Sequence, residues 1–219
     1  MLFPALLPGQ WLEPALRIPL NVLTLRVSKI MDQKSDLDLV QDVRNGNRQA
    51  FTELMRRYQQ RVYWVARRIV GTHEDADDIA QEAFIKAYLG LGDFRGDASF
   101  FTWLYRIAVN LSLNAVRKRQ VLNYLRESEV LSRILPLGND PHQDLELQET
   151  EARLQRAIAI LPEKQRAVFV LRYYDEMPYE EIAGVLKTSV GGLKANYFHA
   201  LRKVQEYMKD ETSTRNSAH

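Results

Sequence analysis

The spacing of apolar residues constrains this fold most, because they recur every three or four positions between residues 51 and 208. That spacing places them on one face of an α-helix, and no stretch alternates apolar and polar residues as a half-buried strand does. The sequence therefore predicts an all-α protein. Ten glycines and eight prolines in 219 residues are too few for a turn-rich β-sandwich, and 46% hydrophobic residues can form a sizeable core.

Helix start and stop signals divide this pattern into two small helical domains joined by a flexible acidic linker. Thr72 and Ser189 are typical helix N-caps, Asp97 can cap the aromatic segment, and Pro162 and Pro178 suit first helical positions. The linker is acidic, joins two basic surfaces and is too polar to form a core of its own, so we expect it to fold back when the protein is free. We predict four helices over 36–119, a linker over 120–145, four shorter helices over 146–209 and a disordered tail over 210–219.

Residues 1–35 form an N-terminal extension of a different character. Residues 1–30 are apolar, contain four prolines and one acidic residue, and include no run of transmembrane length. The uncharged start does not match a signal peptide. Our interpretation is that translation starts at Met31, and the alternative is a flexible or membrane-touching arm.

The last quarter of the chain has helix-turn-helix spacing. A short helix over 179–186, a tight turn over 187–189 and a longer helix follow one another, as in proteins that place the second helix in the DNA major groove. Its outer face is basic, which favours phosphate contacts, although an ordinary helical hairpin is the alternative. The DNA-facing residues would be Lys194, Ala195, Phe198, His199, Arg202 and Lys203.

A second candidate nucleic-acid site lies in residues 94–119, where aromatic and basic side chains are interleaved. Rings that stack on bases, beside cations that meet phosphates, suit single-stranded nucleic acid. The loop from Gly92 to Gly96 would let the backbone approach an extruded base. The alternative is a buried aromatic core with a solvated basic end.

The helix before this segment carries the opposite charge. Asp75, Asp78 and Glu82 fall at i, i+3 and i+7 on one face, with Gln81 beside them. An arginine-rich protein partner suits such a face, and a solvated acidic face is the alternative. Three carboxylates could also bind a metal ion, but the sequence shows no second ligand cluster. The absence of cysteine excludes cysteine-ligated zinc and thiol nucleophiles.

In this order the segments closely resemble the bacterial RNA polymerase sigma factors of the extracytoplasmic-function (ECF) group, and sigma-E-like members in particular. The resemblance covers about residues 36–208. It rests on DDIAQEAFIKAY (77–88), FRGDASFFTWLYRIAVN (94–110) and LPEKQRAVFVLRYYDEMPYEEIAGVLKTSVGGLKANYFHALRKV (161–204).

The resemblance implies a non-catalytic factor that binds core RNA polymerase and directs promoter recognition, strand opening and transcription initiation. It implies no cofactor, no metal and no small-molecule substrate. The partners would be core polymerase, promoter DNA as duplex and as opened strand, and an anti-sigma factor. The protein would be cytoplasmic and could be tethered at a membrane through that anti-sigma factor.

The resemblance also implies residue roles. Core polymerase would bind Asp75, Asp78, Gln81 and Glu82. The minus-ten element and strand opening would involve Phe94, Arg95, Ser99, Trp103, Tyr105, Arg106, Asn110, Arg117, Lys118 and Arg119. The minus-thirty-five element would contact Lys194, Ala195, Phe198, His199, Arg202 and Lys203. The family usually has arginine at the positions of Lys194, Asn196 and His199, so we expect an altered minus-thirty-five preference, because lysine lacks the guanidinium fork.

Two other functions stay open. A helix-turn-helix regulator that acts without polymerase is the first, and the acidic docking helix argues against it. A metal-dependent hydrolase that uses Asp75, Asp78 and Glu82 is the second. It lacks a nucleophile–base pair, a phosphate-binding loop and a second ligand set.

Overall fold

The computed structural model describes the backbone of residues 34–126 and 145–216, and the side chains of residues 34–122 and 149–209. All regular elements in these ranges are helical, which confirms the predicted all-α fold. Predictions for residues 1–33, 127–144 and 217–219, among them the start at Met31, lie outside the described residues. The elements are α2 (Asp36–Arg44), α3 (Arg48–Val70), α4 (His73–Gly90), the 3₁₀ turn η1 (Leu91–Asp93), α5 (Phe100–Arg126), α6 (Leu145–Ala159), α7 (Glu163–Tyr173), α8 (Tyr179–Leu186) and α9 (Val190–Asn216).

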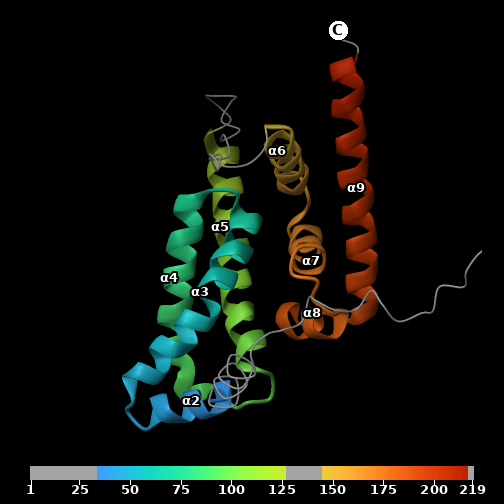
Figure 1. Ribbon diagram of the computed structural model, residues 1–219. Helices are drawn as coiled ribbons and strands as arrows, with labels where there is room; N and C mark the ends of the chain where they lie inside the picture. The colour runs from blue at the N-terminus through green and yellow to red at the C-terminus, as the bar shows by residue number, and fades with distance from the viewer. Residues whose placement is uncertain (1–33, 127–144, 217–219) are drawn as a thin grey trace, which may run out of the picture.

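Helices α2 to α5 form the N-terminal half of the described chain (Figure 1). Helices α3, α4 and α5 pack against one another, and α2 packs on α3. The apolar stripes that the sequence predicts face this shared core, which buries Phe51, Leu54, Val62, Ile69, Ile79, Phe84, Phe100 and Leu104.

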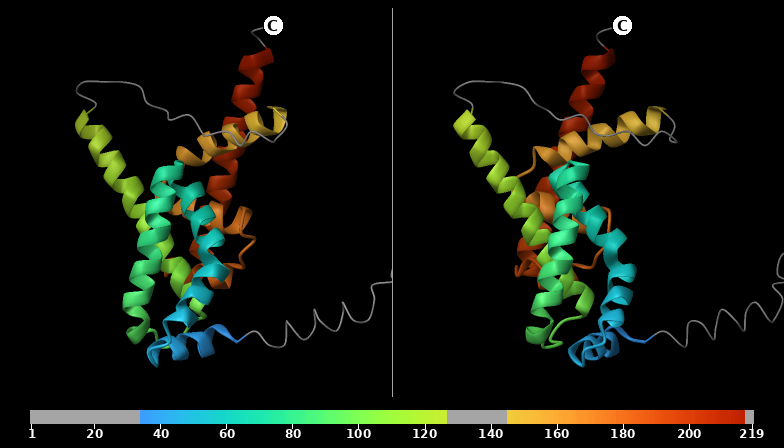
Figure 2. Two further views of the ribbon diagram at one scale, coloured as in Figure 1. Left: turned by 60° about the vertical axis from the view of Figure 1, so that its left-hand side comes forward. Right: turned by 90° about the vertical axis from the view of Figure 1, so that its left-hand side faces the viewer.

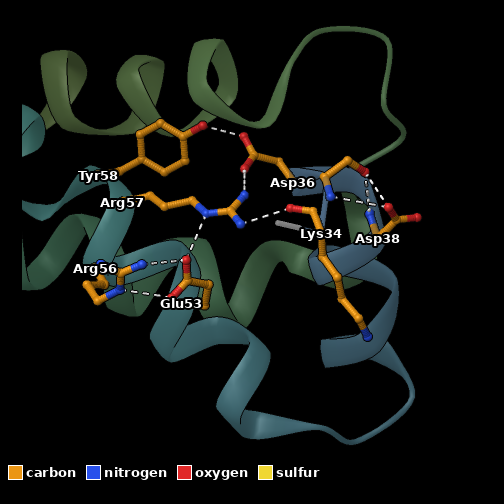
Figure 3. Close-up of polar contacts among 8 residues, drawn as sticks. Lys34, Asp36, Asp38, Glu53, Arg56, Arg57 and Tyr58 are labelled. Carbon is orange, nitrogen blue, oxygen red and sulfur yellow. Dashed lines mark hydrogen bonds and ion pairs between the residues drawn. The ribbon is translucent and has the colours of Figure 1, made fainter. Parts of the chain in front are cut away.

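A polar network fixes α2 on α3 (Figure 3). The Arg57 guanidinium donates to the Asp36 carboxylate at 2.8 Å, and the Tyr58 hydroxyl donates to the same carboxylate. The Tyr58 ring also packs against Phe100 and Phe101 at centroid distances of 5.8 and 5.7 Å. The network therefore holds the N-terminal end of α5, where the predicted strand-opening segment begins.

Helices α6 to α9 form the C-terminal half, in which α9 packs along α7 and also contacts α6 and α8 (Figure 1). Helix α8 ends at Lys187, which has a left-handed φ of 50°. The hydroxyl of Ser189 then accepts a hydrogen bond from the backbone N–H of Gly192 at 3.3 Å. This cap and turn confirm the predicted helix-turn-helix.

Three sequence-based boundaries were wrong. Helix α5 continues to Arg126, so residues 120–126 are helix rather than linker, and α9 continues to Asn216, so residues 210–216 are helix rather than disordered tail. Neither extension contains glycine or proline, so no backbone signal ends the helix there. Ser99, and not Asp97, caps α5, because the Thr102 backbone N–H donates to the Ser99 hydroxyl at 3.0 Å.

The two halves pack against each other (Figure 2). Helix α5 contacts α7 and α8, and α3 contacts α6 and α7. We call this contact the interdomain seam. Within the described ranges no helix combines the length and apolar content needed to cross a bilayer.

Candidate polymerase and nucleic-acid interfaces

The predicted docking residues Asp78, Gln81 and Glu82 lie exposed on α4. Thr72 caps this helix, because its hydroxyl accepts from the Asp75 backbone N–H. The Glu82 carboxylate makes a surface ion pair with Lys86 at 3.4 Å, and both side chains are about half exposed. Such a pair contributes little to folding stability, so these side chains are available to a partner.

Asp75 is less available to a protein partner. Its carboxylate accepts from the Thr72 hydroxyl and from the Arg119 guanidinium, and Arg119 also donates to the Val70 carbonyl at 3.0 Å. Asp75 and Arg119 thus tie the start of α4 to α5, away from the surface where we expected them to act. Across the side chains described here, no three histidine, aspartate or glutamate residues gather as metal ligands would.

Two large apolar side chains extend the acidic face of α4, and the sequence reasoning missed them. Ile85 is 59% exposed and Leu89 is 76% exposed. With Asp78 and Glu82 they fall at i, i+4, i+7 and i+11, so all four share one face of the helix. The signal was present in the sequence, because both residues lie off the buried stripe of α4.

The loop before α5 lines an open pocket of about 210 Å³. Phe94, Arg95, Trp103 and Arg106 line it, so the structure brings these four predicted minus-ten residues together. The Phe94 ring is buried and packs 5.2 Å from the Trp103 ring, which makes it a wall of the pocket. Gly96 has a φ of 79°, a conformation that a side chain would strain.

Arg44 holds this loop in place, and no local sequence pattern pointed to it. Its guanidinium donates to the Leu91 carbonyl at 3.0 and 2.8 Å and also to the Phe94 carbonyl. Charged hydrogen bonds of this kind hold the loop carbonyls in place. The pocket therefore has a preformed backbone.

The other predicted minus-ten residues lie apart from the pocket. Ser99 is the N-cap of α5. Tyr105 is 1% exposed, and its hydroxyl donates to the Arg61 carbonyl at 3.3 Å. Tyr105 is therefore buried in this structure, and its role in strand opening stays a prediction. Asn110, Arg117 and Lys118 are exposed further along α5.

The recognition face of α9 is accessible as predicted, with Lys194, Ala195, Phe198, His199 and Arg202 exposed and Lys203 half-buried. Phe198 is 62% exposed, and its ring lies 5.8 Å from the ring of the neighbouring His199. The Asn196 amide donates to the Gly192 carbonyl at 2.8 Å, so it is occupied on its own helix.

Two family models match the chain, namely Sigma-70 region 2 over residues 54–121 and Sigma-70, region 4 over residues 151–204. The chain is 33% identical to the RNA polymerase sigma-H factor of Pseudomonas aeruginosa, over 82% of this chain and 97% of that protein. It is 34% identical to the ECF RNA polymerase sigma factor SigW of Bacillus subtilis, over 78% and 95%. It is 37% identical to the ECF RNA polymerase sigma-E factor of Escherichia coli, over 77% and 92%. The chain belongs to the ECF sigma factors.

Solved structures agree with this assignment. The ECF sigma factor resembles CnrH, solved in complex with the cytosolic domain of CnrY, with a TM-score of 0.61 and 25% identity over 81% of this chain and 99% of CnrH. It shares the fold of RpoE from Bartonella quintana, solved with the anti-sigma factor NepR, with a TM-score of 0.60 and 21% identity over 73% and 96% of the two chains. The region 2 match spans most of α3, α4 and α5, and the region 4 match spans α6 to α9.

Proposed function

We propose that this ECF sigma factor binds core RNA polymerase through α4 and reads promoter DNA with two surfaces of different chemistry. Residues 36–126 would form the region that binds polymerase and the minus-ten element, and residues 145–209 the region that binds the minus-thirty-five element. The observation that supports this division most is the contrast between the pocket before α5, which Phe94 and Trp103 line, and the open, basic face of α9.

The α4 face carries the polymerase contact. Asp78, Gln81 and Glu82 offer charge and amide groups, and the neighbouring Ile85 and Leu89 offer apolar area that polymerase can bury. Central apolar anchors surrounded by polar groups are typical of protein–protein contacts. A rigid helix that presents these exposed groups on one face is suited to docking.

The pocket before α5 takes an extruded base of the opened strand. Trp103 supplies a ring for stacking, and Arg95 and Arg106 supply cations for phosphates. A base has to leave the duplex stack before it can enter a pocket, so this site acts on separated strands. Arg117 and Lys118, exposed further along α5, extend the path for the strand backbone.

The recognition face of α9 takes duplex DNA. Lys194 and His199 offer donors for base edges, while Arg202 and Lys203 suit phosphates. Phe198 offers an apolar contact such as that made with a thymine methyl group. Because Asn196 is bonded to its own helix, we expect it to contribute less than an arginine would at that position.

Family membership supports three further proposals. The factor is not an enzyme, since the family acts through polymerase. It works in the cytoplasm, where core polymerase lies. An anti-sigma factor regulates it, and the support is that a neighbour with the same fold was solved with the anti-sigma factor NepR.

A polymerase-binding assay and a promoter-opening assay test the proposed function. We expect the purified factor to co-elute with core polymerase and the complex to make promoter thymines reactive to permanganate. A factor that binds promoter duplex equally well with and without core polymerase, and never binds core, would instead be a regulator that acts alone.

A further inference from the structure

An open cavity of about 550 Å³ lies in the interdomain seam. Side chains of α3 and α5 line one side of it, and the α7–α8 turn with the start of α8 lines the other. This volume falls within the range of small-molecule sites, roughly 300–1,000 Å³. Of the residues assigned above to polymerase or DNA, Tyr105 alone lines the cavity, so the proposed function leaves the cavity largely unexplained.

Aromatic side chains form much of the cavity wall, namely Tyr58, Phe101, Tyr105 and Tyr174. The Tyr58 hydroxyl donates to the Asp36 carboxylate (Figure 3), and the Tyr105 hydroxyl donates to the Arg61 carbonyl at 3.3 Å. The Phe101 ring lies between these two, with centroid distances of 5.7 Å to Tyr58 and 4.2 Å to Tyr105. Hydrogen bonds and ring packing therefore preform the aromatic wall.

Two of these rings already lie next to a positive charge of the chain itself. The Arg61 guanidinium carbon lies 5.1 Å from the centroid of Phe101, and that of Arg68 lies 4.2 Å from the centroid of Tyr174. The face of an aromatic ring attracts a cation in this way. Rings on both sides of the seam thus provide a setting that suits positive charge.

The charged groups of the cavity are mostly acidic. Among its described lining residues, the carboxylates of Asp175, Glu176 and Glu181 outnumber the single guanidinium, that of Arg61. Glu176 and Glu181 are exposed, and neither forms an ion pair within the described part of the chain. Asp175 pairs with Arg68 at 3.3 Å through Oδ1, whereas its buried Oδ2 has no hydrogen-bond partner. The cavity therefore has negative charge that the chain does not fully compensate.

The turn that carries Glu176 is held in an unusual conformation. Glu176 has a left-handed φ of 50°, which is costly for a residue with a side chain. The Arg172 guanidinium donates to the carbonyls of Glu176 and Met177 at 3.2 and 3.1 Å, and so fixes the turn. The backbone of Glu176 is therefore held in place at the cavity.

We propose that this cavity binds a small organic cation with a planar aromatic body, such as an aromatic amine or amidine. The rings stack on the body of the ligand, while Glu176, Glu181 and Asp175 attract its positive group. The site goes beyond the proposed function, since neither polymerase docking nor promoter reading requires it. Because the ligand contacts both halves, its binding stabilises the folded factor by mass action.

Three probes of one shape test the preference for positive charge. Benzamidine, benzamide and benzoate share a ring and a planar head group, and they are cationic, neutral and anionic. We expect the full chain to bind benzamidine saturably and at least about tenfold more tightly than benzamide or benzoate. Tryptamine, a larger aromatic ammonium ion, should bind as well.

The methyl resonances of the methionines report both the affinity and the place of binding. Met177 lines the cavity, whereas Met208 lies on α9 and does not. In an NMR titration of the methyl-labelled full chain, we expect benzamidine to shift the Met177 resonance and to leave that of Met208 unchanged. The Met177→Leu variant identifies the resonance.

Three results would overturn the proposal. The first is that neither benzamidine nor tryptamine binds at millimolar concentration. The second is that benzamide or benzoate binds as tightly as benzamidine, and tighter benzoate binding would make the cavity an anion site built on Arg61. The third is that the cations bind without shifting the Met177 resonance.

Two neighbouring glutamates of α8 provide a matched pair of variants. Both are exposed, but only Glu181 lines the cavity, and Glu180 does not. We expect Glu181→Gln to weaken benzamidine binding about threefold or more and Glu180→Gln to leave it unchanged. Equal effects of the two variants would contradict a site at this place. None of these measurements needs polymerase or a promoter, so their failure is distinguishable from failure of the proposed function.

Discussion

Arg68 of α3 and Asp175 of the α7–α8 turn join the two halves of the factor, with 3.3 Å between Nη1 and Oδ1. The Arg68 guanidinium also lies 4.2 Å from the centroid of the Tyr174 ring. Burial raises the pKa of Asp175 to about 6, although Arg68 and Arg61 act to lower it. The charged carboxylate therefore loses more by leaving water than it gains from its partner.

We expect this shift to make the free energy of unfolding of the factor depend on pH. The pKa of Asp175 in the folded factor lies above its ordinary value, so folding favours the protonated carboxyl group. The stability that Asp175 contributes is therefore full below pH ~4 and is lost as the pH rises through about 6. Asp175→Asn should then stabilise the factor by about 1–3 kcal/mol at pH 7.5 and by little at pH 4, as measured by urea unfolding. A variant that is clearly destabilised at pH 7.5 would contradict this. The other charged or titratable groups facing Asp175 are Arg61, Arg68, Tyr105, Tyr174, Glu176 and Glu181.

Removal of the arginine should have the opposite effect. Arg68→Ala leaves the Asp175 carboxylate buried without its cation, so we expect a loss of about 1–3 kcal/mol in unfolding free energy at pH 7.5. The Arg68→Ala/Asp175→Asn double variant should recover most of that loss. Arg56→Ala, which removes an exposed arginine of the same helix, is the control and should stay within about 0.5 kcal/mol of the parent. Equal losses in all three variants would argue against a charge effect.

Substitutions of Asp75 and Asp78, both in the first half of α4, should affect stability and polymerase docking separately. Asp78→Arg should abolish core polymerase binding and leave the melting temperature nearly unchanged, because Asp78 is exposed. Asp75→Ala should lower stability by about 1 kcal/mol, because Asp75 holds Thr72 and Arg119. Size-exclusion binding and thermal melting measure the two effects. Unaltered core affinity of Asp78→Arg would remove α4 as the docking surface.

Substitutions in the two DNA-binding surfaces should impair different steps of transcription initiation. Lys194→Ala should weaken binding of duplex minus-thirty-five DNA by about 1–3 kcal/mol if it contacts a base, with strand opening intact once polymerase is bound. Asn110→Ala should leave closed-complex formation near normal and reduce the permanganate reactivity of opened thymines. Arg202→Ala, a phosphate contact in our account, should lower affinity similarly for all promoter sequences. If Lys194→Ala and Asn110→Ala impair the same step equally, the division between α5 and α9 is wrong.

The sequence predicted local features well and long-range ones poorly. The helices, the Thr72 and Ser189 caps and the exposed face of α9 follow from spacing and capping rules that act over a few residues. Residues 68 and 175 lie 107 positions apart, and no local pattern connects them. The hydrogen bond from Arg106 to the Gly184 carbonyl likewise depends on how the two halves meet.

The C-terminal end of α5 is a second feature that the sequence did not predict. Residues 120–126 were assigned to the acidic linker, yet they contain no acidic residue and continue the helix, since neither glycine nor proline interrupts them. Arg44 is a further case, because its role comes from carbonyls of a loop almost fifty residues away. Its own surroundings in the sequence are those of an ordinary helix C-terminus.

Run-off transcription with purified core polymerase and genomic promoter fragments tests the central claim most directly. We predict specific transcripts that need this factor, that are lost with Asp78→Arg and that return with the unmodified chain. The absence of any factor-dependent transcript across the promoter fragments, with core polymerase active alongside another sigma factor, would contradict the account.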